Sequence, residues 1–177
     1  MAWDCSGKKY QPGYVFGHNK ESPQHHLIII DMIRSIIFAE DDEDDQFYFR
    51  EAFHEINKEI QVSFVSNGNE LMQLLKNFLP DLIFLDLEMP YKNGLECLVE
   101  LRHNPVLNKI PVVVLSSTMR PANIQTSYEM GANLFLHKSS RYAEYSDSLK
   151  QVMSMDWDYP ELIRERHCTD MVFHAFN

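Results

Sequence analysis

The segment Asp81–Pro90, DLIFLDLEMP, contains four consecutive apolar residues that end on a carboxylate. Such a short, continuous apolar run is typical of a strand that is buried on both faces. Asp86 follows the run directly, Glu88 comes two residues later, and Pro90 closes the segment. Burying a carboxylate at the end of a core strand costs free energy unless the group is paired or binds a cation. The segment therefore predicts either a costly packing choice or a reactive group at Asp86.

Strand and helix patterns alternate along the chain around this segment. Apolar runs predict five strands, and apolar residues at helical spacing follow each of them. The predicted strands are residues 36–39, 62–65, 82–85, 110–115 and 134–136, and the last predicted helix is 142–155. Because the strands are almost continuously apolar, we expect a parallel sheet covered by helices on both faces. The predicted fold class is therefore α/β.

Length and composition predict one ordinary soluble domain with some additional chain. The chain has 177 residues, of which 45% are hydrophobic and 24% charged, and its formal net charge is -10. This acidity argues against a nucleic-acid binder, because phosphate backbones attract basic surfaces. The apolar stretch 27–39 is interrupted by Asp31 and Arg34 and is shorter than the about 20 residues that a membrane span needs. With no signal-peptide pattern either, we expect a cytoplasmic protein that does not bind membranes.

Three parts of the chain are predicted. Residues 1–31 contain glycine and proline without a sustained period and form an irregular N-terminal extension, residues 32–156 form the domain, and residues 157–177 form a short C-terminal extension. The last part is too small for a DNA-binding output module. Since the first convincing strand begins just after Met32, one hypothesis is that Met32 is the native start. Detection of native peptides from upstream residues would contradict it.

Charged and hydroxyl side chains lie within two residues of the ends of four of the predicted strands. Glu40 and Asp41 follow the first strand, Asp86 the third, Ser116 the fourth and Lys138 the fifth. The carboxyl ends of parallel strands meet at one edge of a sheet, so these side chains should converge. Three close carboxylates repel one another unless a cation lies among them, and Mg²⁺ prefers such oxygen ligands. A hydroxyl donor and a lysine suit phosphoryl oxygens. The pattern predicts a phosphoryl-transfer site with an Asp nucleophile.

Each of these residues has an ordinary alternative when it is taken alone. The acidic run 40–45, EDDEDD, is typical of the solvated start of a helix, where carboxylates interact well with the helix dipole. Lys138 alone would be a surface lysine, and Ser116 a strand-end hydroxyl. Within the run, Asp41 and Asp42 are an alternative ligand pair. We expect the first two acids to face inward because the apolar strand stops just before them. The simultaneous presence of all the groups favours the site.

Four motifs occur in a recognisable order: FAEDDEDD at 38–45, LIFLDLEMPYKNG at 82–94, VVVLSS at 112–117 and GANLFLHK at 131–138. With these motifs, the chain resembles the receiver domain of response regulators in two-component signalling. The resemblance covers about residues 34–155. It implies a doubly wound, flavodoxin-like sheet of five parallel strands in the order 2-1-3-4-5. It also implies a signalling protein that catalyses only its own phosphorylation and dephosphorylation.

The resemblance assigns roles to the residues at the strand ends. Asp86 would accept a phosphoryl group from the phosphohistidine of a sensor histidine kinase or of a histidine phosphotransfer protein. Asp41 would bind Mg²⁺ directly, Glu40 would bind it directly or through water, and the backbone carbonyl of Glu88 would complete the protein ligands. Lys138 would pair with a phosphoryl oxygen. The ion would offset the negative charge of the carboxylate and of the phosphoryl group.

The resemblance also implies a switch. Ser116 would donate a hydrogen bond to the phosphoryl group and shift its loop, and Phe135 would turn inward in response. Taken alone, Phe135 is equally well a plain core aromatic. Glu88 and Thr118 match positions that tune hydrolysis of the acyl phosphate.

The expected output is docking to a downstream protein. The chain would be a stand-alone regulator, similar to those found with phytochromes, and its moving surface would comprise residues 121–130, 134–136 and the last helix. A homodimer through this surface is possible in the family. Two alternatives stay open. An aspartyl-nucleophile phosphatase would need a second Asp where Glu88 stands, and a degenerate receiver would act only as a binding module.

Overall fold

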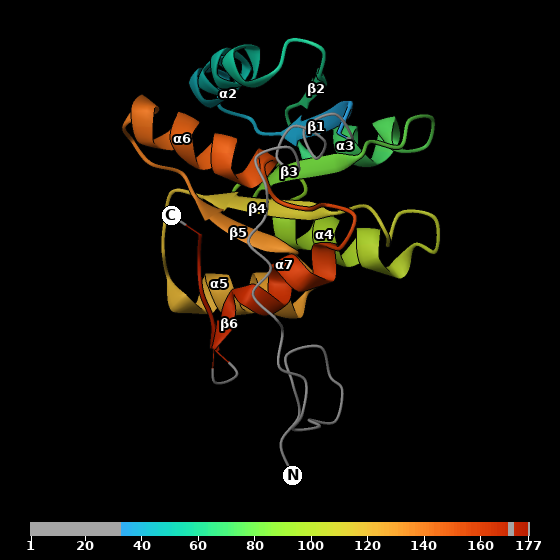
Figure 1. The fold of residues 1–177 in the computed structure, drawn as a ribbon. Helices are drawn as coiled ribbons and strands as arrows, with labels where there is room; N and C mark the ends of the chain where they lie inside the picture. Colours follow the sequence, from blue (N-terminus) through green and yellow to red (C-terminus); the bar gives the residue numbers. More distant parts are fainter. Residues whose placement is uncertain (1–32, 170–171, 177) are drawn as a thin grey trace.

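The computed structural model describes residues 33–169 and 172–176, so the predicted extension 1–31 and the hypothesis about Met32 lie outside the described residues. Five parallel strands form the main sheet in the order β2-β1-β3-β4-β5 (Figure 1), which confirms the predicted fold class and strand order. The strands are β1 (Ser35–Ala39), β2 (Gln61–Val65), β3 (Leu82–Asp86), β4 (Val112–Ser116) and β5 (Leu134–His137).

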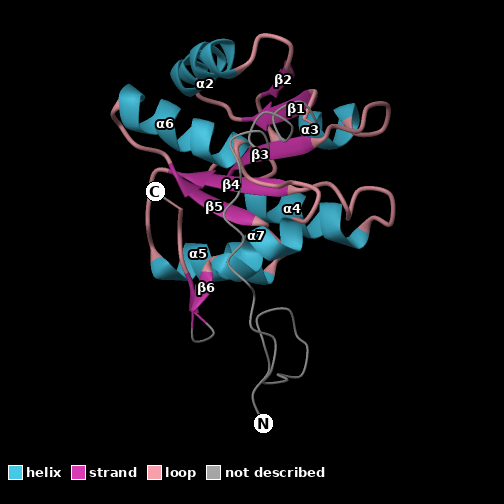
Figure 2. Cartoon of the chain, viewed as in Figure 1, coloured by secondary structure: helices cyan, strands magenta, loops and turns pink. Residues whose placement is uncertain are grey.

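Helices cover both faces of this sheet (Figure 2). They are α2 (Glu43–Ile56), α3 (Gly68–Leu74), α4 (Gly94–His103), α5 (Pro121–Glu129) and α6 (Tyr142–Met153). One core cluster joins the sheet to α3, α4 and α5, and a second cluster joins the opposite face to α2 and α6. Within the described residues, no helix combines the length and the apolar character that a membrane span needs.

Successive side chains of a strand enter opposite clusters. In β1, Ile36 and Phe38 pack toward α2 and α6, whereas Ile37 and Ala39 pack toward α3, α4 and α5. All five residues of β3 are buried. Because neither face of the central strands meets solvent, the sequence of these strands is continuously apolar rather than alternating.

The fourth strand begins two residues later than predicted from the apolar run 110–115. Ile110 belongs to a turn, in which its N–H donates to the carbonyl of Leu107 at 3.0 Å. Pro111 has no N–H to donate to a neighbouring strand, so the regular ladder starts at Val112. The apolar run therefore includes one residue of the preceding turn.

The last helix of the predicted domain ends at Met153 rather than at residue 155. Ser154 is its C-cap, and the Ser154 hydroxyl donates to the carbonyl of Gln151 at 2.7 Å. A hydroxyl that bonds the preceding turn competes with continuation of the helix. The apolar residues at helical spacing continue to Met155 in the sequence, two residues beyond the end of the helix at Met153.

The chain after α6 forms α7 (Pro160–Arg166) and a short antiparallel pair, β6 (Cys168–Thr169) and β7 (Val172–Phe173). Trp157 and Ile163 are buried in the cluster on the α2 and α6 side, and Phe173 is buried in the other cluster. The final described residues return alongside β5, where Phe176 forms a parallel bridge with Leu136 (Figure 1). This part of the chain therefore contributes to both cores.

Candidate functional site

Three carboxylates meet at the carboxyl edge of the sheet. Glu40 follows β1, Asp41 comes next, and Asp86 ends β3, so the parallel pairing of β1 with β3 places them side by side. One ligand oxygen of each lies within 4.8 Å of the others. Glu40 and Asp86 are only 2% and 4% exposed, whereas Asp41 is exposed. Such a set of oxygen ligands, open to water on one side, fits a small hard cation.

Lys138, directly after β5, places its ammonium group among these carboxylates. Its Nζ lies 2.6 Å from Glu40 Oε2, 2.7 Å from Asp86 Oδ1 and 2.8 Å from Asp45 Oδ2. The Lys138 N–H donates to the carbonyl of Ser116 at 2.9 Å, which continues the β4–β5 ladder beyond β5 and positions the side chain. Burial alone would lower the pKa of Lys138, but the charges of Asp86 and Glu40 outweigh burial and raise it. The cluster therefore contains a permanent internal cation.

One ammonium group does not fully compensate the buried carboxylates. Burial raises the pKa of Glu40 to about 7, and the charge of Asp86 adds to this effect while Lys138 opposes it. Burial also raises the pKa of Asp86, against Lys138 and against the N–H of Glu88, which donates to Asp86 Oδ2 at 2.6 Å. A divalent cation would favour the ionised form of both carboxylates, so cation binding and proton loss are coupled here.

The acidic run divides into two parts with different roles. Asp42 is the N-cap of α2, and its Oδ1 accepts from the N–H groups of Asp44 at 2.8 Å and Asp45 at 3.1 Å. Its own N–H donates to Glu40 Oε1 at 3.2 Å. The structure therefore places Asp42 at the helix start and groups Asp41 with Glu40 and Asp86. The helix-start interpretation of the run therefore applies to Asp42, and the metal-ligand interpretation stays a prediction for Glu40 and Asp41.

Two residues near the cluster were missed in the sequence. Asp45 is in the first turn of α2, and the helix brings its carboxylate to Lys138. Tyr145, in α6, is buried, and its hydroxyl has no hydrogen-bond partner among the described residues. Burial raises the pKa of Tyr145, and its hydroxyl is close enough to Lys138 and Asp45 to sense their charges. Helical periodicity predicted which residues of α2 and α6 face the core, but it carries no signal for contacts with a distant strand end.

A glycine lets α4 begin directly against the end of β3. The Gly94 N–H donates to the carbonyl of Leu87 at 3.1 Å. A Cβ atom at Gly94 would lie 2.1 Å from the carbonyl oxygen of Asp86, which no side chain can tolerate. Between these residues, the side chain of Glu88 is exposed. The close approach therefore fixes the loop that carries Glu88 beside Asp86.

The predicted switch residues lie on the two strands beyond β3. Ser116 is buried at the end of β4, and its Oγ accepts from the N–H of Thr118 at 3.1 Å and lies 3.3 Å from Thr118 Oγ1. Phe135 is fully buried in the cluster beside α5, and its N–H donates to the Tyr128 hydroxyl at 3.1 Å. Ser116 thus lies at the same edge as the acidic cluster, with its hydroxyl engaged by Thr118.

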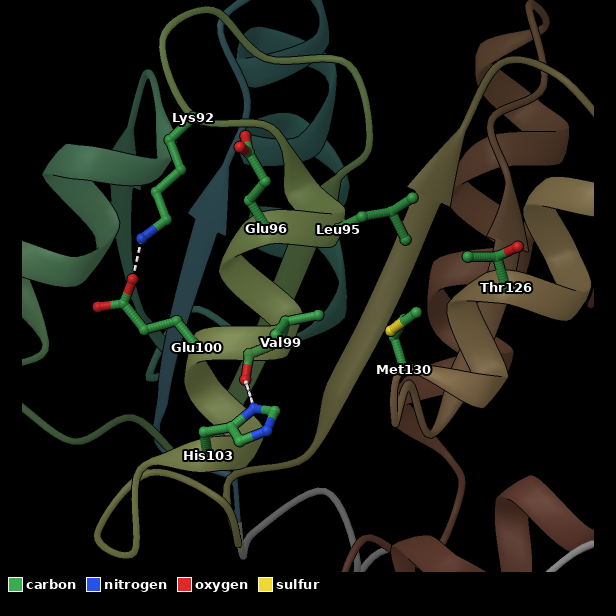
Figure 3. A pocket seen from close by; sticks show the side chains of 8 residues that line it. All are labelled: Lys92, Leu95, Glu96, Val99, Glu100, His103, Thr126 and Met130. Carbon is green, nitrogen blue, oxygen red and sulfur yellow. Dashed lines mark hydrogen bonds and ion pairs between the residues drawn. The ribbon is translucent and has the colours of Figure 1, made fainter.

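A separate groove of about 700 Å³ lies between α4 and α5. Figure 3 shows Leu95 and Val99 of α4 facing Met130, with the ion pair of Lys92 and Glu100 at one side. None of the residues predicted at the strand ends lines this groove. The candidate site for phosphoryl chemistry is therefore the acidic cluster, and the groove is distinct from it.

Known proteins match the part of the chain that carries this site. The family model for the response regulator receiver domain matches residues 36–150. Response regulator Rcp1 of Synechocystis sp. is 47% identical over 60 residues, which are 34% of this chain and 41% of the relative. A probable cyclic di-GMP phosphodiesterase of Vibrio cholerae is 26% identical over 113 residues, which are 64% of this chain and 25% of that protein. These matches span less than half of either curated relative.

Solved structures of similar proteins share the fold. The phosphorylated cyanobacterial phytochrome response regulator RcpA has a TM-score of 0.65 and 32% identity, covering 68% of this chain and 91% of that chain. The Mn²⁺-bound form of response regulator Rcp1 has a TM-score of 0.65 and 29% identity, covering 69% and 93%. The family model matches more than half of the chain and includes all five strands of the main sheet apart from Ser35, the first residue of β1. The protein therefore belongs to the response regulator receiver domain family.

Proposed function

We propose that the protein is a response regulator of two-component signalling that accepts a phosphoryl group on Asp86. One observation carries the proposal: Asp86 is a nearly fully buried carboxylate at the end of β3, within 2.7 Å of Lys138 Nζ and grouped with two further carboxylates. An arrangement that concentrates negative charge beside a lysine is suited to phosphoryl transfer rather than to packing. Membership of the family supports a histidine kinase or a histidine phosphotransfer protein as donor.

Glu40, Asp41 and Asp86 would hold Mg²⁺, together with the backbone carbonyl of Glu88. When bound, the ion supplies positive charge that offsets both the carboxylate and the incoming phosphoryl group. The proximity of the three carboxylates supports this assignment. So does the raised pKa of Glu40, because a carboxylate that burial holds close to neutrality gains from a cation. The relative Rcp1 has been crystallised with Mn²⁺, an ion that takes similar oxygen ligands.

In the transfer step, a carboxylate oxygen of Asp86 attacks the phosphorus of the donor phosphohistidine. An O–P bond forms, the P–N bond breaks, and its electron pair returns to the imidazole, which takes up a proton. The Glu88 N–H holds Asp86 Oδ2, which orients the carboxylate for attack. Lys138 would move one of its contacts from a carboxylate to a phosphoryl oxygen, so its charge follows the transferred group.

Ser116 and Phe135 would pass the change on. To donate to a phosphoryl oxygen, the Ser116 hydroxyl must give up its contact with Thr118, and the loop after β4 would move with it. Phe135 would respond from its buried place in β5. The exposed Glu88 and the neighbouring Thr118 would tune the hydrolysis of the acyl phosphate. The docking surface for a kinase, a downstream protein or a second copy would comprise α5, β5 and α6.

Incubation of the full chain with acetyl phosphate and Mg²⁺, followed by intact mass measurement, tests this function. We expect an adduct with the mass of one phosphoryl group, which the Asp86→Asn variant does not form. Asp81→Asn is the matched control, because Asp81 precedes the same strand at its opposite end, where its carboxylate accepts from the Ser35 N–H at 2.9 Å. An adduct that persists in Asp86→Asn would contradict the assignment. Continuous turnover of phosphomonoesters would indicate an aspartyl phosphatase instead.

A further inference from the structure

Residues 172–176 run from β7, which pairs with β6 and contacts α5, to Phe176, which forms a parallel bridge with Leu136 at the outer edge of β5, the last strand of the main sheet. The Phe176 N–H donates to the carbonyl of Phe135 at 2.7 Å, and the His137 N–H donates to the carbonyl of Phe176 at 3.1 Å. Both bonds use backbone groups on the side of β5 that no other strand of the main sheet pairs with. Phe176 therefore pairs with β5 at this one position in the way that a residue of an added strand does.

One side chain of α5 holds the same segment. The Tyr128 ring stacks on Phe173, with 4.4 Å between the ring centroids and 12° between the planes. The Tyr128 hydroxyl donates to the carbonyl of His174 at 3.1 Å and accepts from the Phe135 N–H at 3.1 Å. Tyr128 is fully buried and Phe173 is 8% exposed, whereas the neighbouring Val172 is 53% exposed. Tyr128 thus links α5, β5 and the segment at once.

This contact surface overlaps the proposed docking surface. A partner that pairs with the edge of β5, or that packs on the Tyr128 ring, must first displace residues 172–176. We propose that the edge of β5 and the Tyr128 ring form a strand-docking surface, that residues 172–176 occupy it in the unphosphorylated protein, and that phosphorylation releases them. This inference rests on the proposed function. An extended segment of a partner, with an aromatic residue in the place of Phe173, would then bind in the vacated position.

The link to the phosphorylation site runs through β5. Phe135 and His137, which hold Phe176, belong to the strand that leads directly to Lys138. The Lys138 backbone is bonded to Ser116, and its ammonium group to Asp86. When a phosphoryl group draws Lys138 and Ser116 toward itself, the end of β5 must adjust, and both bonds to Phe176 depend on that end. By reciprocity, loss of the segment must favour phosphorylation by the same factor as phosphorylation favours its loss.

Amide hydrogen exchange in the full chain tests the release. The His137 N–H is protected only if Phe176 stays in place. We expect its exchange to become roughly tenfold faster or more after acetyl phosphate and Mg²⁺ are added, in line with typical coupling between sites. Asp86→Asn, treated in the same way, should show no change. Intact mass of the same sample reports the adduct independently.

Two neighbouring variants separate this segment from general destabilisation. Phe173→Ala removes the ring that stacks on Tyr128, and Val172→Ala shortens an exposed side chain of the same strand. Without acetyl phosphate, Phe173→Ala should raise His137 exchange toward the phosphorylated level. At a fixed, limiting acetyl phosphate concentration, it should also raise the phosphorylated fraction several-fold. Val172→Ala should change neither quantity.

The two proposals fail in different ways. An adduct on Asp86 together with unchanged His137 exchange would overturn the release of the segment and leave the proposed function standing. Absence of any adduct would overturn both. If Phe173→Ala frees the segment but leaves the phosphorylated fraction unchanged, the coupling between the segment and the acceptor is wrong.

Discussion

The acidic cluster and the C-terminal segment, residues 172–176, are held in place by different forces. The cluster combines buried carboxylates with a single buried ammonium group, and burial leaves Glu40 with a pKa of about 7. The segment is held by backbone hydrogen bonds to β5 and to His167, by the pairing of β7 with β6, by the Tyr128 hydroxyl, and by the contacts of the Phe173 ring with the Tyr128 ring and the Arg164 guanidinium. The first region therefore responds to protons, cations and phosphate. We expect the second to respond to phosphorylation alone, through movement of β5, which makes it suitable for reading out the first.

The largest expected effect comes from removing the internal cation. Lys138→Met leaves the buried carboxylates without their ammonium partner, so we expect the free energy of unfolding without Mg²⁺ to fall by about 3 kcal/mol or more at pH 8. The loss should be smaller at pH 5, where Glu40 can take up a proton. Urea unfolding at both pH values measures it.

Lys150→Met is the control for that variant. Its ammonium group pairs with Glu55 and Asp147 at 3.5 Å, and all three side chains are well exposed. Exposed ion pairs contribute little to stability. If Lys150→Met lowered the free energy of unfolding as much as Lys138→Met does, the net charge of the protein rather than the buried cluster would determine the effect.

The second effect is a pH dependence that Glu40 introduces. Its pKa is about 7 in the folded protein against an ordinary value of 4.5, so the folded state binds more protons between these values. Stability should therefore fall as pH rises through this range, by up to about 3 kcal/mol, in the protein without Mg²⁺. Glu40→Gln should remove the part of this pH dependence that Glu40 causes. The smaller decrease of stability with pH in this variant then reflects Asp86, whose pKa is also raised. An unchanged slope in Glu40→Gln would contradict the assignment.

The third effect concerns the segment and should not depend on the charge of Glu40. Phe173→Ala deletes a buried ring, so we expect a loss of about 2 kcal/mol in the free energy of unfolding, measured by urea denaturation. Because Phe173 contacts the Tyr128 ring and the Arg164 guanidinium rather than the buried carboxylates, the loss should be the same in the unaltered protein and in Glu40→Gln. A loss that differs between these two backgrounds would mean that the segment and the cluster share their energetics in the unphosphorylated protein.

The smallest effect is a gain at Tyr145. Its buried hydroxyl finds no hydrogen-bond partner among the described residues, and such a group costs free energy. Tyr145→Phe should therefore raise the free energy of unfolding by about 1 kcal/mol, measured by urea denaturation. A destabilised variant would indicate that water satisfies this hydroxyl beside the cluster.

The central part of the molecule could be predicted from local patterns. Continuous apolar runs indicate strands that are buried on both faces, and in a parallel sheet the carboxyl ends of the strands lie at one edge. These two facts predict that Glu40, Asp86 and Lys138 lie close together, as they do in the structure. The role of Asp45 could not be found in this way. Its contact with Lys138 depends on the angle at which α2 leaves β1, which no local pattern encodes.

The position of the C-terminal segment could not be predicted from local patterns, for a different reason. Phe173 and Phe176 are isolated aromatic residues without a period, and strands of two residues leave no pattern to detect. Their burial depends on the path of the chain through Trp157 and α7, which returns the segment to β5. The sequence therefore predicts a short C-terminal extension and no partner for it inside the molecule.

The pairing of Phe176 with β5 has a consequence for solubility. In an open parallel sheet, each outermost strand offers unpaired backbone groups to any other extended chain, and such edges promote aggregation. Here, the bonds to Phe135 and His137 cover part of that edge. A protein that exposes β5 in order to signal would therefore also become more prone to self-association. Concentrated samples of Phe173→Ala should precipitate before the unaltered protein does.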